Sequence, residues 1–416
     1  MSDKNNKTLK PGWRRVKFGD VVRLSKARSQ DPLADGIERY VGLEHLEPGD
    51  LRIRNWGNVA DGVTFTSVFQ PGQVLFGKRR AYQRKVAVAD FPGVCSGDIY
   101  VLESKDAQVL LPELLPFICQ TDAFFDHAVG TSAGSLSPRT NWTSLADFEF
   151  ALPKIDEQTR IVETLLAFEK NLEAMEVLLN SARQVVKSAI NSLLTSDHDL
   201  RNAVARFSST SEINLPDGWS LSIASAVCGS PVTSGSTPRE GITDVDTGHP
   251  FLRVQNLSFD GRLDFSSTKY LENHSFISTK KTHVLPGDIL TNIVGPPLGK
   301  VSLVPEGFSE AQINQAIVRF RPKNSRLGKY LTYYLMSEFA KSWLFSRSKK
   351  TSGQRNINSS TCACLPVPMP PDGQIAEISQ RMDSFFEVLK QIETRKASLI
   401  NVRMHLLAQA TGGSRV

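Results

Sequence analysis

The sequence has 416 residues, and 49 lysines and arginines against 43 acidic residues give it a formal net charge of +6. The length suffices for two to three domains, a hydrophobic content of 40% is ordinary for a globular protein, and the positive charge mildly favours a polyanionic partner. The sequence lacks both an apolar run of the roughly 18 residues that a membrane span needs and the apolar core of a signal peptide. Its five scattered cysteines predict reduced thiols in the cytoplasm rather than disulfides or a zinc site.

The most informative feature is an internal repeat, because short motifs of the first half return in the same order in the second half. The repeated pairs are Pro11–Trp13 with Pro216–Trp219, Pro71–Leu75 with Pro286–Leu290, Lys85–Val88 with Lys300–Leu303, and Thr131–Gly134 with Thr351–Gln354. A long helical stretch follows each copy. The pattern predicts two similar domains at a fixed separation, which suits a ligand with two marks along its length, such as DNA.

Residues 1–152 form the first predicted domain, called the first copy below. Turn signals such as Pro-Gly and Ser-Gly-Asp bound three short β-like runs, Gln73–Phe76, Lys85–Ala89 and Ile99–Leu102. A helix is expected over Leu114–Ala128. Short strands set by turns, together with a few helices, predict an α+β domain.

Residues 215–370 form the second copy and repeat this plan. Strands are expected at Ile289–Asn292 and Lys300–Val304, and a helix at Leu327–Phe345. The Ser- and Thr-rich stretch 196–214 between the copies is predicted to be a linker.

Residues 153–195 predict the first long helix. Apolar residues recur there with heptad spacing over about five heptads, which is typical of a coiled coil. The predicted seam contains Ile161, Leu165, Phe168, Leu172, Met175, Leu179, Val186 and Leu193. Asp156 is positioned to cap the start of this helix.

Residues 371–410 predict the second long helix, with a seam of Ile378, Met382, Phe385, Leu389, Ile392 and Leu399. One apolar row fails at Lys396 and Arg403, so the seam is expected to weaken toward the C-terminus. Each long helix has to bury its stripe, and the other offers the matching surface. We therefore expect an α+β fold with a pseudo-two-fold internal repeat and an intramolecular antiparallel coiled coil; pairing between two chains is the competing arrangement.

Positive charge is most concentrated between two predicted strands of the first copy. Residues 76–85 contain no acid and carry Lys78, Arg79, Arg80, Tyr82, Arg84 and Lys85. Such a loop can neutralise phosphates, and arginine can read guanine edges with two hydrogen bonds. We predict that these six residues bind DNA; the alternative is a solvated loop, or one that anchors acids inside the domain.

A second cluster of predicted DNA contacts is rich in small hydroxyl residues and glycine, which let backbone amides approach a phosphate. In the first copy it comprises Ser135, Ser137, Arg139 and Asn141. The corresponding candidates of the second copy are Lys349, Lys350, Ser352, Gln354, Arg355 and Asn356. Further candidates there are Thr237, Arg239, Arg253, Asn256, Asn292 and Lys300, and the basic stretch from Arg319 to Arg355 predicts a phosphate-facing surface. The alternative for these clusters is a set of plain surface turns and a solvated helix face.

Catalytic motifs are missing from the sequence. It has neither a Gly-x-x-x-x-Gly-Lys-Ser/Thr phosphate loop nor the Asn/Asp-Pro-Pro-Tyr/Phe signature of adenine methyltransferases. Asp90, Glu103 and Lys105 fit the loose spacing of a metal-dependent nuclease, but the second copy has no equivalent. A stand-alone nuclease, and a coiled-coil scaffold without a DNA role, are the two alternatives to a DNA-recognition protein.

With these features together, the chain resembles the specificity (DNA-recognition) subunit of type I restriction–modification systems over nearly its whole length. The resemblance rests on the Pro-Gly-Trp openings, Pro-Gly-Asp-Ile-Leu at 286–290, Thr-Ser-Gly-Gln at 351–354 and Leu-Pro-x-x-Asp-Glu-Gln at 152–158. The entry to the second long helix departs from the family pattern, with Gly373 where Glu is usual. This departure is expected to loosen that helix start or its contact with a partner.

The resemblance implies two target-recognition domains that each read one half of a split, asymmetric DNA site. It implies no catalysis and no cofactor in this chain. Two adenine-N6 methyltransferase subunits would bind S-adenosylmethionine, and restriction subunits would use ATP and Mg²⁺. The long helices would set the unread spacer and provide a docking surface for the methyltransferases.

Overall fold

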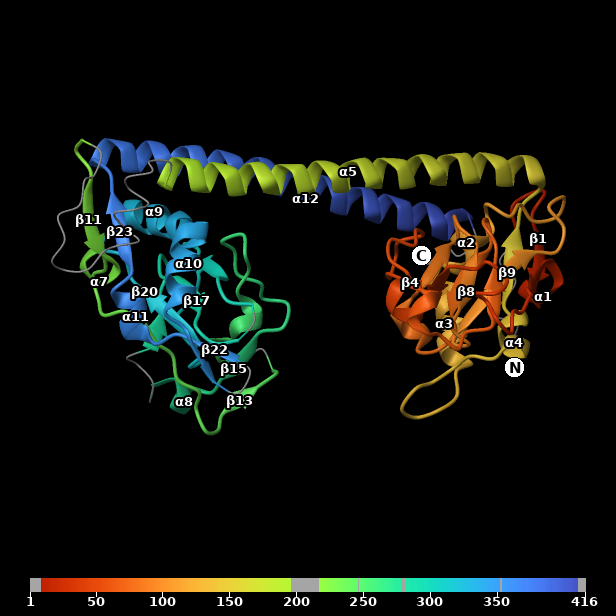
Figure 1. The fold of residues 1–416 in the computed structure, drawn as a ribbon, viewed down its shortest axis with the longest axis horizontal. Coiled ribbons are helices and arrows are strands. Elements are labelled where there is room, and N and C mark those ends of the chain that lie inside the picture. The colour runs from red at the N-terminus through yellow and green to blue at the C-terminus, as the bar shows by residue number, and fades with distance from the viewer. Residues whose placement is uncertain are drawn as a thin grey trace. The chain divides into compact units, whose positions relative to one another are not determined.

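The computed structural model describes residues 9–195, 217–245, 247–277, 282–295, 297–351 and 354–410. The chain divides into two compact units, Met1–Val177 with Thr394–Val416, and Leu178–Glu393. Each unit contains one copy of the repeat together with parts of both long helices (Figure 1). The predicted linker 196–214 lies outside the described residues.

The first unit is built on two four-stranded sheets. The antiparallel sheet has the order β2 (Val22–Leu24), β9 (Ile99–Ser104), β6 (Val74–Gly77) and β7 (Val86–Val88). The mixed sheet has the order β4 (Gly57–Asn58), β3 (Arg39–Val41), β8 (Gly93–Cys95) and β5 (Ser67–Phe69), with β3 and β8 parallel. A separate pair joins β1 (Arg14–Lys17) to β10 (Glu149–Leu152). The short helices are α1 (Phe18–Val21), α2 (Leu115–Cys119), α3 (Asp122–Gly130) and α4 (Trp142–Ala146), with 3₁₀ turns η1 (Leu43–His45), η2 (Val59–Asp61) and η3 (Ala81–Gln83).

The second unit repeats this topology. Its antiparallel sheet has the order β12 (Thr233–Ser234), β20 (Ile317–Phe320), β17 (Ile289–Asn292) and β18 (Val301–Leu303). Its mixed sheet has the order β13 (Ile242–Thr243), β15 (Lys269–Leu271), β14 (His249–Leu252), β19 (Ala311–Ile313) and β16 (His283–Val284). Two strand pairs join β11 (Ser220–Ile223) to β23 (Pro366–Met369), and β21 (Lys349–Thr351) to β22 (Gln354–Asn356). The helices are α7 (Ala224–Val227), α8 (Asn273–Ile277), α9 (Ser325–Met336), α10 (Glu338–Ser346) and α11 (Ser359–Ala363), with the 3₁₀ turn η4 (Val254–Asn256).

The two units share both sheets and the terminal strand pair, and the second adds β13 at the edge of its mixed sheet and the pair β21–β22. The shared topology confirms the internal repeat and the α+β class. In each, a parallel pair lies inside the mixed sheet, β3 with β8 and β14 with β19. In each, the strand after the Pro-Gly motif, β6 or β17, lies inside the antiparallel sheet and is buried along its whole length. Burial on both faces explains the apolar run of β6, whereas in β17 the buried Thr291 and Asn292 bond to backbone groups.

The helices expected over Leu114–Ala128 and Leu327–Phe345 are each broken in two. The break falls at Thr121 in the first copy and at Ser337 in the second, where the hydroxyl accepts a hydrogen bond from a backbone N–H three residues later, at 3.3 and 3.2 Å. A hydroxyl side chain in an extended residue satisfies an unpaired N–H of the next helix. The break therefore follows from helix capping, which apolar periodicity does not report.

The first long helix, α5 (Ile155–Thr195), begins one residue before the predicted cap. Asp156 therefore lies in the first turn, where a carboxylate is stabilised by the helix dipole, and does not act as the N-cap. The second long helix is α12 (Asp372–Ala410). No helix in the described part of the chain combines the length and the apolar character that a bilayer span requires.

Two motif residues attach the start of α5 to the first copy. The indole Nε1 of Trp13 donates to Glu157 Oε2 at 2.9 Å. The side chain of Gln158 has no exposed surface and accepts from the N–H of Leu111 at 2.9 Å. Its amide nitrogen donates to the carbonyls of residues 109 and 153, both at 2.9 Å. The Pro-Gly-Trp and Asp-Glu-Gln motifs thus form one structural joint.

The start of α12 is equivalent by backbone hydrogen bonding, but with a shift from the sequence alignment. In α5 the N–H groups of Glu157 and Gln158 donate to residue 154, and in α12 those of Gln374 and Ile375 donate to residue 371. Ile375 is buried and occupies the place of Gln158. The structure therefore corrects the expectation for Gly373, which corresponds to Asp156 rather than to Glu157, and the helix begins regardless.

We expect Gly373→Asp to stabilise the second unit by about 1 kcal/mol, because it removes a helical glycine and places a carboxylate in the first turn. A Cβ at this position would have no heavy atom within 4 Å. The free energy of urea unfolding measures the change, and Gly373→Ala isolates the glycine contribution. A destabilised Gly373→Asp variant would contradict this assignment.

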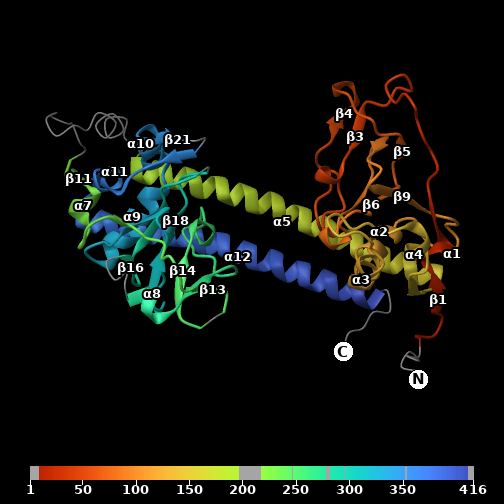
Figure 2. The ribbon, with the colours of Figure 1, turned by 90° about the horizontal axis from the view of Figure 1, so that it is seen from below.

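Inside the first unit, the two long helices run antiparallel (Figures 1 and 2). As α5 residue numbers rise from Glu169 to Glu176, the ion-paired α12 residues fall from Arg403 to Lys396. Leu165 and Leu407 are buried in the same core. The pairing is intramolecular, as the sequence predicts.

The second unit shows the same antiparallel contact. Val186 and Ile190 of α5 share a core with Ile378 and Met382 of α12. Arg183 donates to Glu393 at 3.2 Å.

The predicted seam residues face inward to different degrees. The buried members are Leu165, Leu179, Val186, Ile378, Met382 and Leu389. The half-buried members are Ile161, Phe168, Leu172, Met175, Phe385, Ile392 and Leu399. The side chain of Leu193 lies outside the described residues.

The second seam does not fail at Lys396 and Arg403, because each cation pairs with a carboxylate of α5. The Arg403 side chain is only 5% exposed, and its guanidinium binds Glu169, which is 17% exposed, and the side-chain oxygen of Gln120. Lys396 pairs with Glu176. The row continues with charges that are neutralised across the coiled coil, a device known to fix helix register in some proteins.

Candidate nucleic-acid interface

The two loops of the first copy that the sequence nominates separately form one surface. The N–H of Arg80 donates to the carbonyl of Pro138 at 2.7 Å, and the N–H of Thr140 donates to the carbonyl of Lys78 at 3.1 Å. The segment that follows β6 and the loop that follows α3 are therefore joined by backbone hydrogen bonds. We call residues 78–85 the basic loop and residues 131–141 the hydroxyl loop.

A single carboxylate holds the two loops together. Asp98 accepts from Arg139 Nε at 2.7 Å and from Arg79 Nη1 at 3.2 Å. Its side chain is 19% exposed, and burial alone would raise its pKa, but the hydrogen bonds from Arg139 and Arg79 outweigh burial and lower the pKa. Asp98 therefore stays ionised and fixes both arginines. The local charge count missed it because it lies outside both loops in the sequence.

The basic loop has a strained backbone. Arg80 and Arg84 have φ values of 53° and 56°, and they are the only non-glycine residues with positive φ in the described part of the chain. This left-handed conformation is uncommon for such side chains and tends to occur at functional sites. The two residues bracket the turn η3, which buries Ala81 and leaves the Tyr82 side chain 57% exposed.

Most cations of the basic loop also have partners inside the domain. Arg84 donates to Asp122 at 2.7 Å and lies over the ring of Phe125, and Lys85 donates to the carbonyl of Leu43 at 2.7 Å. Lys78 lies over the Tyr100 ring, and burial lowers its pKa. The anchoring alternative thus describes part of this loop, whose one exposed residue is Tyr82.

The hydroxyl loop divides in the same way. Ser135 and Arg139 are exposed, whereas Ser137 is half-buried and lies within hydrogen-bonding distance of Arg79 and Arg80. Asn141 Oδ1 accepts from the N–H of Ser144 at 2.8 Å and caps helix α4. The side-chain oxygen of Asn141 is therefore committed to the fold, whereas the residue itself is exposed, and its role as a base-reading group stays a prediction.

The second copy has the same backbone frame. The N–H of Ile357 donates to the carbonyl of Ile293 at 2.8 Å, and the N–H of Gly295 donates to Arg355 at 3.1 Å. These bonds match those of the first copy one for one. They also show that the counterpart of Asn141 is Asn358, which caps helix α11.

The side chains on this shared frame differ. The bridge between Arg79 and Arg139 becomes a bridge between Val294 and Asn356. The backbone N–H of Lys78 donates to the backbone carbonyl of Asp98, and the backbone N–H of Ile293 donates to that of Ala316. Ala316 therefore stands in the place of Asp98. The second copy therefore has no carboxylate where the first has its clamp.

Exposed candidates of the second copy lie mainly on the β21–β22 hairpin. Lys349, Lys350 and Gln354 are exposed, and Arg355 lies over the ring of Phe345 at 4.0 Å from its centroid. Asn356 is half-buried. Ser352 lies outside the described residues.

Several other candidates hold the loops of the second copy from within. Asn256 has no exposed surface and Asn292 almost none, and their amide groups bond to backbone groups of residues 253 and 264, and of 297, 299 and 300. Both are corrected from DNA contacts to supports of a loop. Arg253 donates to the carbonyl of Ser267, and Lys300 to that of Val254, while Thr237 bonds to Gln315 and Arg239 is exposed.

The basic stretch that begins at Arg319 is not a single surface. Arg319 is buried and donates to the carbonyl of His283, and Arg321 binds the buried Asp288 through two hydrogen bonds of 2.7 Å. Lys329 pairs with Asp383. These cations belong to the fold, which corrects the expectation of a continuous phosphate-facing stretch.

The nuclease alternative finds no support in the geometry. Glu103 accepts from Arg23 and from Gln73 at 2.7 and 2.8 Å, and Lys105 donates to a backbone carbonyl. Within the described residues, His, Cys, Asp and Glu side chains form no group able to hold a metal ion. Glu103 instead joins β9 to Arg23 of β2 and to Gln73, the residue before β6.

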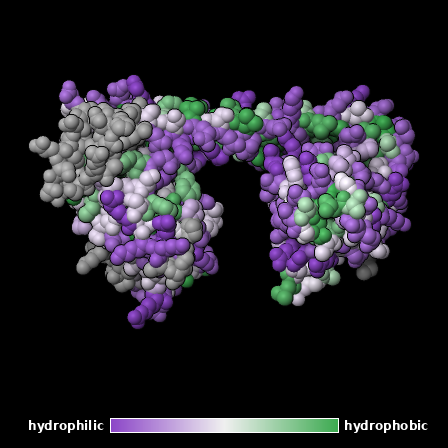
Figure 3. Space-filling model, viewed as in Figure 1, coloured by the Kyte–Doolittle hydropathy of each residue, from purple (hydrophilic) through white to green (hydrophobic). Residues whose placement is uncertain are grey.

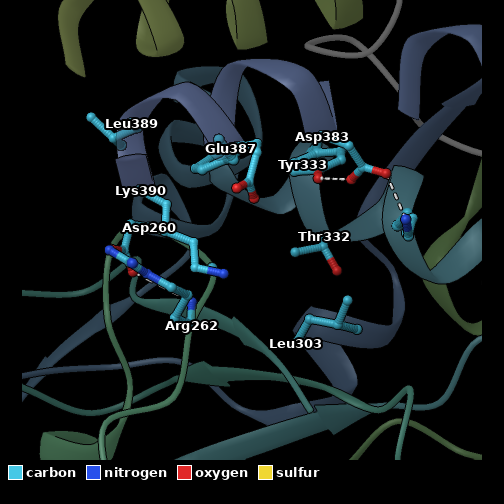
Figure 4. Close-up of a pocket in the computed structure, with 12 residues that line it drawn as sticks. Asp260, Arg262, Leu303, Thr332, Tyr333, Asp383, Glu387, Leu389 and Lys390 are labelled. Atoms are coloured by element: carbon cyan, nitrogen blue, oxygen red, sulfur yellow. Dashed lines mark hydrogen bonds and ion pairs between the residues drawn. The ribbon is translucent and has the colours of Figure 1, made fainter. Parts of the chain in front are cut away.

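A cavity of about 290 Å³ in the second unit lies between α9, α12 and the loop at residues 260–262 (Figure 4). Its charged groups are largely paired with each other. Asp383 accepts from Lys329 and Tyr333, both at 2.5 Å, and Arg262 pairs with Asp260 and Glu393. Burial and the nearby Asp383 raise the pKa of Tyr333. The ion pairs and hydrogen bonds around the cavity attach α12 to the second copy.

The model of the type I restriction modification DNA specificity domain matches this chain twice, at residues 12–183 and 240–401. The chain belongs to this family. Each match covers much of one copy and most of the long helix that follows it. The family model thus finds the same repeat that the two strand topologies show.

Relatives of this specificity family include type I restriction enzyme subunits from Escherichia coli. The EcoBI specificity subunit is 26% identical over an alignment of 315 positions that covers 70% of this chain and 65% of that subunit, just under two thirds of its length. The EcoDI specificity subunit is 23% identical over an alignment of 433 positions that covers 96% of this chain and 88% of that subunit.

Solved structures show the same fold. A chain from a structural study of complex assembly and conformational transition of the type I R-M system aligns with a TM-score of 0.57 at 19% identity, covering 97% of this chain and 98% of its own. The type I S subunit from M. genitalium aligns with a TM-score of 0.50 at 14% identity, covering 98% of both chains.

Proposed function

We propose that this chain is the DNA-recognition subunit of a type I restriction–modification complex and reads a bipartite, asymmetric site, one half with each copy. The observation that carries the proposal is the shared frame with different side chains. Both copies present a loop pair joined by the same backbone bonds, yet Arg79, Asp98 and Arg139 of one copy are replaced by Val294, Ala316 and Asn356 in the other. Equivalent positions with unlike chemistry suit two modules that read different bases.

Catalysis belongs to partner subunits in this proposal. Two adenine-N6 methyltransferase subunits bind S-adenosylmethionine and extrude the target adenine. Restriction subunits use ATP and Mg²⁺. The antiparallel long helices set the unread spacer and offer the methyltransferases a docking surface. All five cysteines are free, which supports a cytoplasmic location.

Salt-dependent binding tests the DNA role. Lys349 and Lys350 are exposed on the β21–β22 hairpin. Replacing both with alanine is expected to weaken DNA binding about tenfold and to reduce the slope of log K against log salt by about 2, because each phosphate contact releases counterions. Fluorescence anisotropy with a labelled duplex at several salt concentrations gives both values.

The matched control removes two exposed cations of α5, Arg160 and Lys170. It is expected to leave the salt slope unchanged. An equal loss in both double variants would show a general effect of net charge, and an unchanged slope in the hairpin variant would remove that surface from the interface.

A further inference from the structure

Leu136 is the most exposed large apolar side chain of the described residues, at 88%. It lies in the turn of the hydroxyl loop, between the bridged residues Ala133 and Arg139. This loop protrudes from the first copy, and a small hydrophobic patch lies at its tip (Figures 1 and 3). A leucine left in water forgoes the favourable free energy of burial. Single exposed apolar side chains are common on protein surfaces, so the position of Leu136 on a protruding loop, more than its exposure, points to an interaction.

The loop that carries Leu136 is closed and held at its base. Ala133 and Arg139 exchange two backbone hydrogen bonds, each of 3.0 Å, and Gly134 supplies a φ of 110° for the turn between them. Arg139 is bound by Asp98, and the backbone N–H of Arg80 holds the carbonyl of Pro138. Ordering the tip on binding therefore costs little conformational entropy.

The surroundings of Leu136 identify its partner. The side chain of Arg80 lies 3.5 Å from the Leu136 carbonyl, and Arg79 and Arg139 lie at the base of the same loop. A protein interface has an apolar core made of several side chains, whereas Leu136 is the one exposed large apolar side chain of residues 131–141. An apolar tip among arginines and serine hydroxyls matches the DNA duplex, with phosphates at the groove edge and stacked bases inside it.

We propose that Leu136 inserts as a wedge between two stacked base pairs of the half-site read by the first copy. The insertion unstacks that step, so the copy selects a step that deforms easily as well as the bases that it contacts. This inference rests on the proposed DNA-recognition function. It assigns a specificity-determining role to a residue without hydrogen-bonding groups in its side chain, which is why a search for basic and polar motifs missed it.

The test uses the full chain without partner subunits, so that adenine extrusion by a methyltransferase does not interfere. The probe is a duplex that carries the split motif found by chain-dependent methylation sequencing, with 2-aminopurine placed in turn at adenines of each half-site. Wild type and Leu136→Met are expected to raise the fluorescence at one step of one half-site. Leu136→Ala and Leu136→Ser are expected to lose this signal and about tenfold or more in affinity.

A duplex with a mismatch at that step provides the rescue. Because the mismatched step is already unstacked, Leu136→Ala is expected to bind it with most of the wild-type affinity. Specific binding by wild type together with an unchanged signal in Leu136→Ala overturns the wedge and leaves the recognition function intact. A wild-type chain without preference for the motif duplex overturns both. Because Leu136 is 88% exposed, its replacement is not expected to disturb the core. A circular dichroism spectrum of each variant checks that it folds.

Discussion

Replacing Arg403 with methionine is expected to destabilise the first unit by about 3 kcal/mol, because the change leaves the largely buried carboxylate of Glu169 without its partner. The loss also removes the contact with Gln120, which ties the C-terminal half of α12 to the first copy. Urea unfolding, followed by the near-ultraviolet signal, measures the free energy.

The double variant Glu169→Leu with Arg403→Met provides the control, because an apolar pair of similar volume restores most of the loss. Arg381→Ala on the same helix breaks an exposed pair with Glu377 and is expected to have little effect. If the single and double variants lose the same stability, the pair does not fix the helix contact.

Gln158→Leu is expected to lower the free energy of unfolding of the first unit by about 3 kcal/mol, although the two side chains have nearly the same volume. The change removes three hydrogen bonds and leaves backbone groups of the half-buried Val109 and Leu111 and of the buried Pro153 without their partner. The thermal unfolding midpoint of the first unit should fall.

Gln374→Leu is the matched control, because Gln374 lies in the first turn of the other long helix but is exposed. The thermal unfolding midpoint of the second unit, which contains Gln374, is expected to stay close to that of wild type. Similar midpoints for both variants would mean that Gln158 is not the joint between α5 and the first copy.

The sequence predicted the fold where its rules are local or periodic. The repeat follows from motif order, and the long helices follow from heptad spacing. Periodicity failed at Thr121 and Ser337, because a capping hydroxyl ends one helix and starts another without breaking the apolar pattern. It failed again at Arg403, because a cation in the seam is stable when a carboxylate faces it from the other helix.

The candidate interface was predicted only in part, for a different reason. Both loops of the first copy stand out in the sequence, but their contact depends on strand pairing between residues far apart along the chain. Asp98 stands in the sequence only as part of a turn signal, and Leu136 carries no motif of its own. Asn141 and Asn256 have suitable chemistry for reading bases, yet their side chains satisfy backbone groups, which only the folded chain reveals.

The most direct test of two recognition modules is single-molecule sequencing of adenine methylation in cells that contain the partner methyltransferase, with and without this chain. The expected result is a split, asymmetric motif that disappears when the chain is deleted. The double variant Arg80→Ala with Tyr82→Ala should relax one half of that motif and leave the other half intact. The absence of any chain-dependent motif in cells with an active methyltransferase would contradict the proposed function.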